Sequence, residues 1–224
     1  MLPIVPLGDT AALVHLSDEA AASRLAAAAR IGVVPGRLDV VQAYASVAVF
    51  FDPRQLQFAR ASAWLRSLDV KAIPVVAAGR SVVIPCCYEF GPDLERVAEH
   101  TKLALADVIA RHSAAEYTVY AIGFCPGFPY LGYLPAELSG VPRLPAPRPR
   151  VEPGSVGLTG RQTGLYPLAR PGGWNLIGRT PLEMVNLADG YFPLRTGDHV
   201  RFRPIDREEY ERLRGRRLGD VAGG

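Results

Sequence analysis

The residues best suited to chemistry lie between Tyr117 and Pro181. This segment contains eight aromatic residues and only two acids, Glu137 and Glu152, against six arginines at positions 143, 148, 150, 161, 170 and 179. Arginine presents a planar fork of donors, glycine lets a ligand approach backbone N–H groups, and aromatic rings exclude water. The segment therefore favours a surface that binds an anion such as a carboxylate or a phosphate, although the corners of a small barrel also require glycine and proline.

A complete catalytic set is harder to find. The sequence has no P-loop, dinucleotide-binding, zinc-protease or CxxC motif. Four histidines, at positions 15, 100, 112 and 199, have no metal-ligand spacing; His15 fits a packed strand position, and His112 either ends a helix or acts as a base. Cys125 has no charged sequence neighbour that would activate it, which favours a structural thiol over a nucleophile. We therefore expect this chain to carry part of an active site that a partner completes.

Length and composition bound the class of protein. With 224 residues, 49% of them hydrophobic and 21% charged, the chain can form one large domain or two small ones around a true core. Its net charge of +3 is too small to indicate nucleic-acid binding. No apolar run approaches the roughly 18 residues of a membrane span, and the N-terminus lacks the pattern of a signal peptide. Three cysteines, two of them adjacent, do not form a disulfide framework, so we expect a cytoplasmic protein.

Two composition regimes divide the chain. Residues 1–100 hold 12 glycines and prolines, whereas the 59 residues 123–181 hold 22. The first regime predicts a domain at residues 1–80 with the order strand, helix, strand, strand, helix, strand, which is the split βαβ or ferredoxin-like pattern. The expected strands are 11–16, 38–44, 47–51 and 71–78. The expected helices run from Ser17-Asp18 to about Arg30, and from Asp52-Pro53 to about Leu68.

The second regime predicts a β-rich domain at residues 81–224, so the fold class is α+β. We expect a strand at 81–89, two short helices at 92–101 and 105–112, and a strand at 116–122. Beyond that point the helical period disappears, and short apolar pieces alternate with glycine and proline, which is typical of an all-β, barrel-like body. A charged helix is expected at 206–217.

Four segments of the glycine-rich half resemble one protein family. They are residues 123–131, 154–157, 162–167 and 171–181. Through them the chain resembles the B subunit of the bacterial ATP-dependent 5-oxoprolinase complex. That family is also called allophanate hydrolase subunit 1, and it includes an inhibitor of a sporulation histidine kinase. Weaker matches at 49–53, 90–94 and 197–202 extend the resemblance along the chain.

The resemblance implies a small α/β domain followed by a cyclophilin-like β-barrel. It also implies two partners: the C subunit of 5-oxoprolinase, with a homologous carboxyltransferase-like fold, and the A subunit. Such a complex couples Mg-dependent ATP cleavage to opening of the 5-oxoproline lactam, which yields L-glutamate. Two alternatives remain open: a regulatory binder that inhibits a sensor histidine kinase, and an allophanate- or urea-amidolyase-type carboxyltransferase component. The sequence has no biotin-acceptor motif, so the last ranks lower.

Side-chain chemistry, in these motifs and near them, gives the candidate site residues. Arg179 and Gln162 lead, for recognition of an anion and of an amide respectively, with His112 as the candidate base. The candidates for contacts to substrate or nucleotide are Tyr130, Thr163, Tyr166, Gly172, Gly173, Trp174 and Thr180. The alternative role for Thr163 and Tyr166 is to cap turns. The alternative role for Trp174 is to plug the barrel. Asp93 and Glu89 are the nearest acids able to hold Mg²⁺, although the contiguous Tyr88-Glu89-Phe90 departs from the family's usual spacing.

Overall fold

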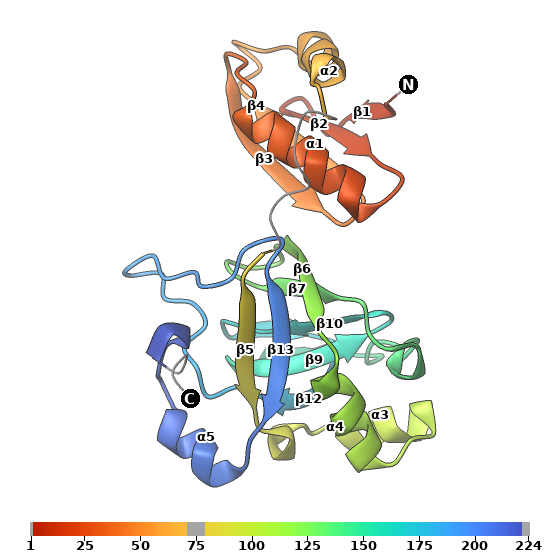
Figure 1. Cartoon of the computed structure of the whole chain (residues 1–224), viewed down its shortest axis with the longest axis vertical. Helices are drawn as coiled ribbons and strands as arrows, with labels where there is room; N and C mark the ends of the chain where they lie inside the picture. Colours follow the sequence, from red (N-terminus) through yellow and green to blue (C-terminus); the bar gives the residue numbers. More distant parts are fainter. Residues whose placement is uncertain (1, 71–78, 221–224) are drawn as a thin grey trace. The chain divides into compact units, whose positions relative to one another are not determined.

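The computed structural model describes residues 2–70 and 79–220. The chain divides into two compact units, residues 1–78 and 79–224. The first unit contains, in chain order, β1 (Ile4–Pro6), β2 (Ala11–His15), α1 (Glu19–Ile31), β3 (Arg37–Ala43), β4 (Ser46–Phe51) and α2 (Phe58–Ser67). Its four strands form an antiparallel sheet in the order β1-β2-β4-β3 (Figure 1).

Both helices of the first unit pack against one core. Ala22 and Leu25 of α1 and Leu65 of α2 are buried together with Val14 and Val49 of the sheet. Asp18 caps α1 as expected, because its carboxylate accepts a hydrogen bond of 2.7 Å from the Ala21 amide. The split βαβ order is therefore present for three strands and both helices. The strand expected at 71–78 lies outside the described residues, and the sequence does not predict the short strand β1.

The second helix begins later than the sequence suggests. The Asp52-Pro53 pair predicts a start at that point, but α2 begins at Phe58. The Asp52 carboxylate accepts hydrogen bonds from the backbone and side chain of Arg54 and from the side chain of Gln55, at 3.0–3.1 Å. These contacts close a separate turn, so the same Asp-Pro signal starts a turn here instead of a helix.

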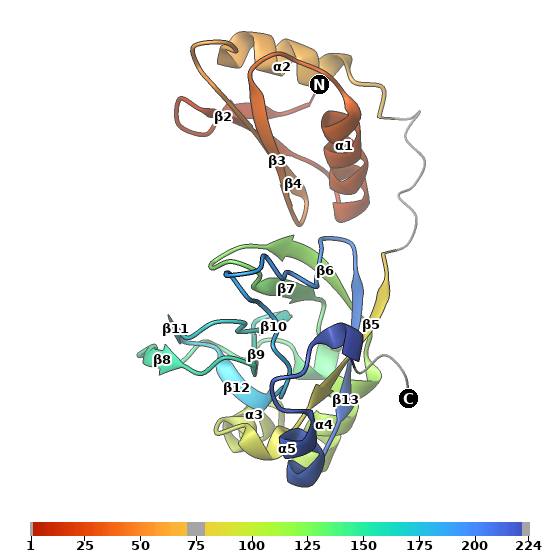
Figure 2. The same cartoon turned by 90° about the vertical axis from the view of Figure 1, so that its left-hand side faces the viewer.

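The second unit is built mainly of strands. Its elements are β5 (Ser81–Cys86), α3 (Leu94–Thr101), α4 (Leu105–Ala114), β6 (Tyr117–Ile122), β7 (Pro129–Gly132), β8 (Arg148–Val151), β9 (Ser155–Thr159), β10 (Gln162–Leu165), β11 (Arg170–Gly172), β12 (Asn175–Arg179), β13 (His199–Pro204) and α5 (Arg207–Leu213). Single-turn 3₁₀ helices occupy 88–90, 136–138 and 218–220. Seven strands form one sheet in the order β12-β9-β10-β7-β6-β13-β5, and β8 and β11 form a separate ribbon (Figure 2).

The seven-stranded sheet nearly closes on itself. Just beyond β5, Cys87 exchanges two backbone hydrogen bonds of 2.8 and 2.9 Å with Arg179 of β12, which brings the two outer strands together. β5 and β13 run parallel and side by side (Figure 1). The predicted α+β class with a barrel-like second part is thus confirmed. Within residues 2–70 and 79–220, every helix is too short or too polar to cross a bilayer.

Candidate active site

Four aromatic side chains gather at one part of the second unit. We call Phe128, Tyr130, Tyr166 and Trp174 the aromatic cluster. The Phe128 ring lies edge-to-face against the other three, with centroid distances of 5.0 Å to Tyr130, 5.1 Å to Tyr166 and 5.5 Å to Trp174. All but Tyr130 are buried, and Cys125, Val151 and Leu176 complete the group. The cluster is therefore a packed apolar wall with a half-exposed tyrosine at its edge.

Glycine at position 172 makes this packing possible. A Cβ atom added there would lie 2.4 Å from the Tyr166 hydroxyl, which is closer than any side chain tolerates. The backbone of Tyr166 is held at both ends, because its amide donates to Ser155 and its carbonyl accepts from Gly154. Because the Tyr166 ring is also packed against Phe128 in the buried cluster, it has little room to move, and glycine fits opposite its hydroxyl.

Arginines border the cluster. The chain at Arg143 is anchored on both sides, since Asn175 Nδ2 donates to the Pro142 carbonyl at 2.9 Å and the Leu144 amide donates to the Gly173 carbonyl at 2.7 Å. These anchors hold Arg143 beside the residues that flank Trp174. Arg170 begins β11 and contacts the Cys125 thiol.

Two of the bordering arginines lack acidic partners. Arg148 and Arg150 form ion pairs with Asp93 and Glu152, whereas neither Arg143 nor Arg170 forms one with any residue that the structure describes. The Nη1 atom of Arg148 is buried and has no hydrogen-bond partner among those residues either. Guanidinium groups without a carboxylate partner are free to bind an anionic ligand beside the aromatic wall.

Burial sets the protonation states in the cluster. It raises the pKa of the Tyr130 and Tyr166 hydroxyls, and the nearby Arg143 offsets part of that effect. Burial also raises the pKa of the Cys125 thiol, despite the contact with Arg170. The thiol is thus protonated at neutral pH and is not an activated nucleophile. The cluster can bind and shield an anionic ligand, but it does not supply a nucleophile from Cys125.

The predicted binding residues divide into separate groups. Tyr130, Tyr166, Gly172, Gly173 and Trp174 come together in and around the aromatic cluster. Thr180 is buried and follows β12, where its amide donates to the Gly154 carbonyl at 2.9 Å. The Thr180 side chain is therefore shielded from solvent and from any ligand on the surface of this chain.

His112 lies in the core and not on a surface. It has no exposed area, its Nδ1 lies 2.7 Å from the Tyr88 hydroxyl, and its Nε2 lies 3.0 Å from the Thr163 hydroxyl. Burial lowers the pKa of His112 to about 3, so the imidazole is neutral and weakly basic. With no exposed area in this chain, His112 and Thr163 fit a structural role, and the catalytic role of His112 stays a prediction.

Arg179 and Gln162 are not neighbours. Arg179 pairs with Ser155 and Gln162 pairs with Thr159, on opposite edges of β9. The step of four residues from Ser155 to Thr159 corresponds to roughly 13 Å along the strand. Arg179 donates from Nε to the Pro153 carbonyl at 2.9 Å. Both side chains are half-buried, so each can contact a ligand or partner, but they do not form one binding pair.

The two acids considered for Mg²⁺ are already engaged. One Asp93 carboxylate oxygen accepts from Arg148 at 2.6 Å, and the other accepts from the Leu176 amide at 2.7 Å. Glu89 pairs with Arg207 at 2.8 Å. Among the described residues, no group of three or more potential ligand side chains converges on one point. Asp93 therefore stabilises the junction of α3 and β12, and these acids do not fit a magnesium site.

Sequence reasoning missed the particular arginines that border the cluster. A signal was present: residues 138–151 and 153–182 contain no acid at all. That pattern points to the arginines as a group, yet only the fold shows that Arg148 and Arg150 find acids elsewhere while Arg143 and Arg170 do not. The contribution of Cys125 to the apolar wall also depends on a fold-level contact.

Comparisons with known proteins converge on one family. The family model for the carboxyltransferase domain, subdomain C and D, matches residues 2–191. The B subunit of 5-oxoprolinase from Bacillus subtilis (strain 168) is 36% identical over 228 residues, which cover 92% of this chain and 94% of that protein. The agreement extends over nearly the whole of both sequences.

Two solved structures with the same fold belong to longer chains. A crystal structure of TTHA0988 matches with a TM-score of 0.75 and 37% identity, covering 88% of this chain but 40% of that chain. This chain thus spans less than half the length of TTHA0988. Urea amidolyase of K. lactis matches with a TM-score of 0.75 over 98% of this chain and 15% of that chain. At 19% identity this second likeness shows the fold alone.

Proposed function

This chain belongs to the family of 5-oxoprolinase B subunits, and from that membership we propose that it is one component of an ATP-dependent 5-oxoprolinase. The assembly opens the lactam ring of 5-oxoproline to give L-glutamate and contains two further components, the C and A subunits. We place it in the cytoplasm, which the three free cysteines support.

One observation carries the proposal: the aromatic cluster is bordered by Arg143 and Arg170, which have no acidic partner among the described residues. 5-oxoproline is a small lactam ring that bears one carboxylate. A guanidinium fork suits the carboxylate, and an aromatic wall suits the ring. Arg143 and Arg170 bind the substrate carboxylate in this proposal, with Tyr130 and Trp174 beside the ring.

The reactive groups come from the partner subunits. Lactam amides resist hydrolysis, and transfer of a phosphoryl group from ATP to the lactam oxygen creates a leaving group. In this chain the Cys125 thiol is protonated, His112 is inaccessible, and Asp93 and Glu89 are paired. We therefore assign the magnesium–nucleotide site and the base to the interface with the C and A subunits. Arg179 and Gln162 are candidates for contacts with those partners.

Reconstitution tests this proposal. The chain is co-expressed with the C and A subunits of the same genome, and glutamate release is measured with and without ATP and 5-oxoproline. Arg143→Gln and Arg170→Gln should each raise KM for 5-oxoproline by roughly tenfold, the loss of about 1.4 kcal/mol of binding. Arg150→Gln is the matched control, because Arg150 is exposed and already paired with Glu152.

Four outcomes would contradict the proposal or favour an alternative. Glutamate release by this chain without partners would contradict the composite site. Unchanged KM in both arginine variants would remove the aromatic cluster as the substrate site, and the same assay with Arg179→Ala and Gln162→Ala then tests each of those two positions separately. A reconstituted complex that consumes urea-derived allophanate and not 5-oxoproline would favour the amidolyase-type alternative, and an inactive one that inhibits a sensor kinase would favour the regulatory alternative.

A further inference from the structure

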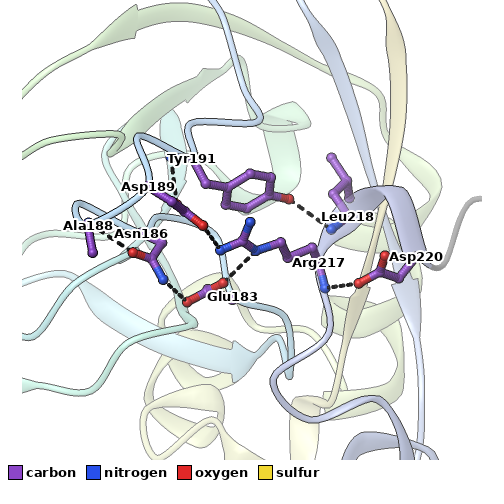
Figure 3. Close-up of polar contacts among 8 residues, drawn as sticks. All are labelled: Glu183, Asn186, Ala188, Asp189, Tyr191, Arg217, Leu218 and Asp220. Carbon is purple, nitrogen blue, oxygen red and sulfur yellow. Dashed lines mark hydrogen bonds and ion pairs between the residues drawn. The ribbon is translucent and has the colours of Figure 1, made fainter.

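Arg217, in the segment after α5, connects that segment to the loop of residues 183–191. Arg217 donates from Nε to Glu183 at 2.7 Å and from Nη2 to Asp189 at 2.5 Å, and its guanidinium lies 4.5 Å from the centre of the Tyr191 ring (Figure 3). The Leu218 amide donates to the Tyr191 hydroxyl at 2.9 Å, and the Glu183 amide donates to the Arg216 carbonyl. Residues 216–218 therefore hold residues 183–191 through side chains and backbone together.

The loop of residues 183–191 is closed by its own hydrogen bonds. Asn186 and Tyr191 exchange two backbone hydrogen bonds of 2.9 and 3.0 Å. The Asn186 side chain donates to Glu183 and accepts from the Ala188 amide (Figure 3). Arg217 binds two acids at different points of this loop. It therefore fixes the orientation of the loop as well as its position.

The loop packs directly against a turn of the candidate site. A Cβ atom at Gly127 would lie 2.2 Å from Cγ2 of Val185 and 3.4 Å from Phe192. The backbone of Gly127 thus approaches the loop as closely as glycine allows. Residues 123–128 form a tight turn, in which the Phe128 amide donates to the Cys125 carbonyl and the Gly123 amide to the Phe128 carbonyl. This turn contributes Cys125 and Phe128 to the apolar wall.

The turn itself is strained. The Cys125 amide donates to the Gly123 carbonyl at 2.7 Å, and Phe124 between them has φ of +65°. A bulky residue at positive φ in a γ-turn is rare and persists only where surrounding contacts enforce it. The Phe124 ring is 59% exposed and touches the rings of Phe128 and Tyr166 at the rim of the cluster. External support for this turn is therefore needed, and the 183–191 loop provides it.

We propose that Arg217 is a positioning residue for the substrate site: it holds the 183–191 loop, which holds the 123–128 turn and hence Cys125 and Phe128. The importance of this chain of contacts for substrate binding rests on the proposed function. The contacts themselves can be tested without any activity. Removal of Arg217 frees the loop, the turn relaxes, and Cys125 becomes more accessible.

The test measures the rate at which a thiol reagent modifies each cysteine of the full chain, followed by mass spectrometry. Cys125 is 8% exposed, whereas Cys86 and Cys87 are fully buried and report global unfolding. In Arg217→Ala, the rate at Cys125 should rise several-fold while the rates at Cys86 and Cys87 stay unchanged. Arg217→Lys keeps the positive charge but loses the forked guanidinium. Its modification rate at Cys125 should lie between those of the wild type and Arg217→Ala. Arg214→Ala is the matched control, because Arg214 forms an exposed ion pair with Glu211 on α5.

Tyr191→Phe is the milder second variant, since it removes only the hydroxyl that accepts from Leu218. It should raise the Cys125 rate by less than Arg217→Ala does. An unchanged rate at Cys125 in both variants overturns the proposal, and so does a parallel rise at all three cysteines, which would make Arg217 a contributor to global stability only. In the reconstituted complex, a raised KM with unchanged kcat links the turn to substrate binding. If Cys125 responds but KM does not, the positioning holds and the substrate site of the proposed function fails.

Discussion

The imidazole of His112 donates from Nε2 to the hydroxyl of Thr163 across 3.0 Å, and neither side chain has any exposed surface. The direction follows from the next contact: the Thr163 hydroxyl lies 3.0 Å from the Gly157 carbonyl, which can only accept. Its single proton is thus committed, and Nε2 must carry the imidazole proton. Nδ1 then accepts from the Tyr88 hydroxyl. One neutral tautomer connects α4 to β10 and to the turn after β5.

This buried histidine makes stability depend on pH. The folded pKa of His112 is about 3, below its ordinary value of 6.5, so the unfolded chain binds one more proton between those two values. Stability is full above pH 6.5 and is lost as the pH falls, by up to about 1.4 kcal/mol per pH unit. Urea unfolding across this range measures the slope.

Two variants complete that experiment. His112→Gln should be less stable near neutral pH and should show a smaller slope between pH 6.5 and 3, because the titrating imidazole is gone. His100→Gln changes an exposed histidine on α3 and should keep the wild-type slope. Equal slopes in the wild type and His112→Gln would contradict the assigned protonation.

Adjacent glycines give a matched pair at the aromatic cluster. Gly172→Ala places a methyl group 2.4 Å from the Tyr166 hydroxyl and should destabilise the fold by about 1–3 kcal/mol. At Gly173 the new methyl group would lie 3.6 Å from Pro147, an ordinary contact, so Gly173→Ala should stay within about 0.5 kcal/mol of the wild type. Thermal unfolding compares them; equal effects would show that Tyr166 moves freely.

Asp93 is expected to act through stability and not through metal. Asp93→Ala removes the acceptor of Arg148 and of the Leu176 amide, and should cost about 2–3 kcal/mol, because a largely buried guanidinium loses its partner. Glu152→Ala breaks the exposed pair with Arg150 and should cost much less stability than Asp93→Ala, because solvent screens an exposed ion pair. If Asp93 were instead a magnesium ligand, Asp93→Ala would keep its stability and lose only Mg-dependent activity.

The ion pairs of Arg217 with Glu183 and Asp189 should weaken at acidic pH. Hydrogen bonds from Arg217 lower the pKa of both Glu183 and Asp189 below their ordinary values of 4.5 and 3.8. Their contribution to stability is therefore present above those values and is lost as the pH falls through the lowered pKa values. The difference in melting temperature between wild type and Arg217→Ala should shrink over that range. Arg216→Ala, at a neighbouring arginine, should show a difference that does not change with pH.

The strand and helix pattern was predictable because it depends on local signals. The cap at Asp18, the apolar alternation of the β6 strand and the change to frequent glycine and proline after residue 123 each act over a few residues. The Asp52-Pro53 signal misled for the same reason, since turns and helices begin alike and only the contacts of Arg54 and Gln55 distinguish them. Short β1 has only three residues, too few for a pattern.

The site was only partly predictable. The motif segments named Tyr130, Tyr166 and Trp174 as candidates, and the structure brings the three together in one cluster, whereas their contact with a ligand stays a prediction. The separation of Arg179 from Gln162 could not be found, because it depends on the register of both neighbours of β9. The enclosure of His112 depends on Tyr88 and Thr163, 24 and 51 residues away, and such distant pairs leave no local trace.

Because β5 pairs with β13, the sheet cannot be completed until late in synthesis on the ribosome. Ser81 lies beside His199, so the partner of an early strand is translated 118 residues later. Until that partner emerges, β5 and β6 each present an unpaired edge, and closing so long a loop is slow. Nascent chains of this protein are thus most open to aggregation or chaperone capture while residues 87–198 are being made, and the barrel can complete only once β13 has left the exit tunnel.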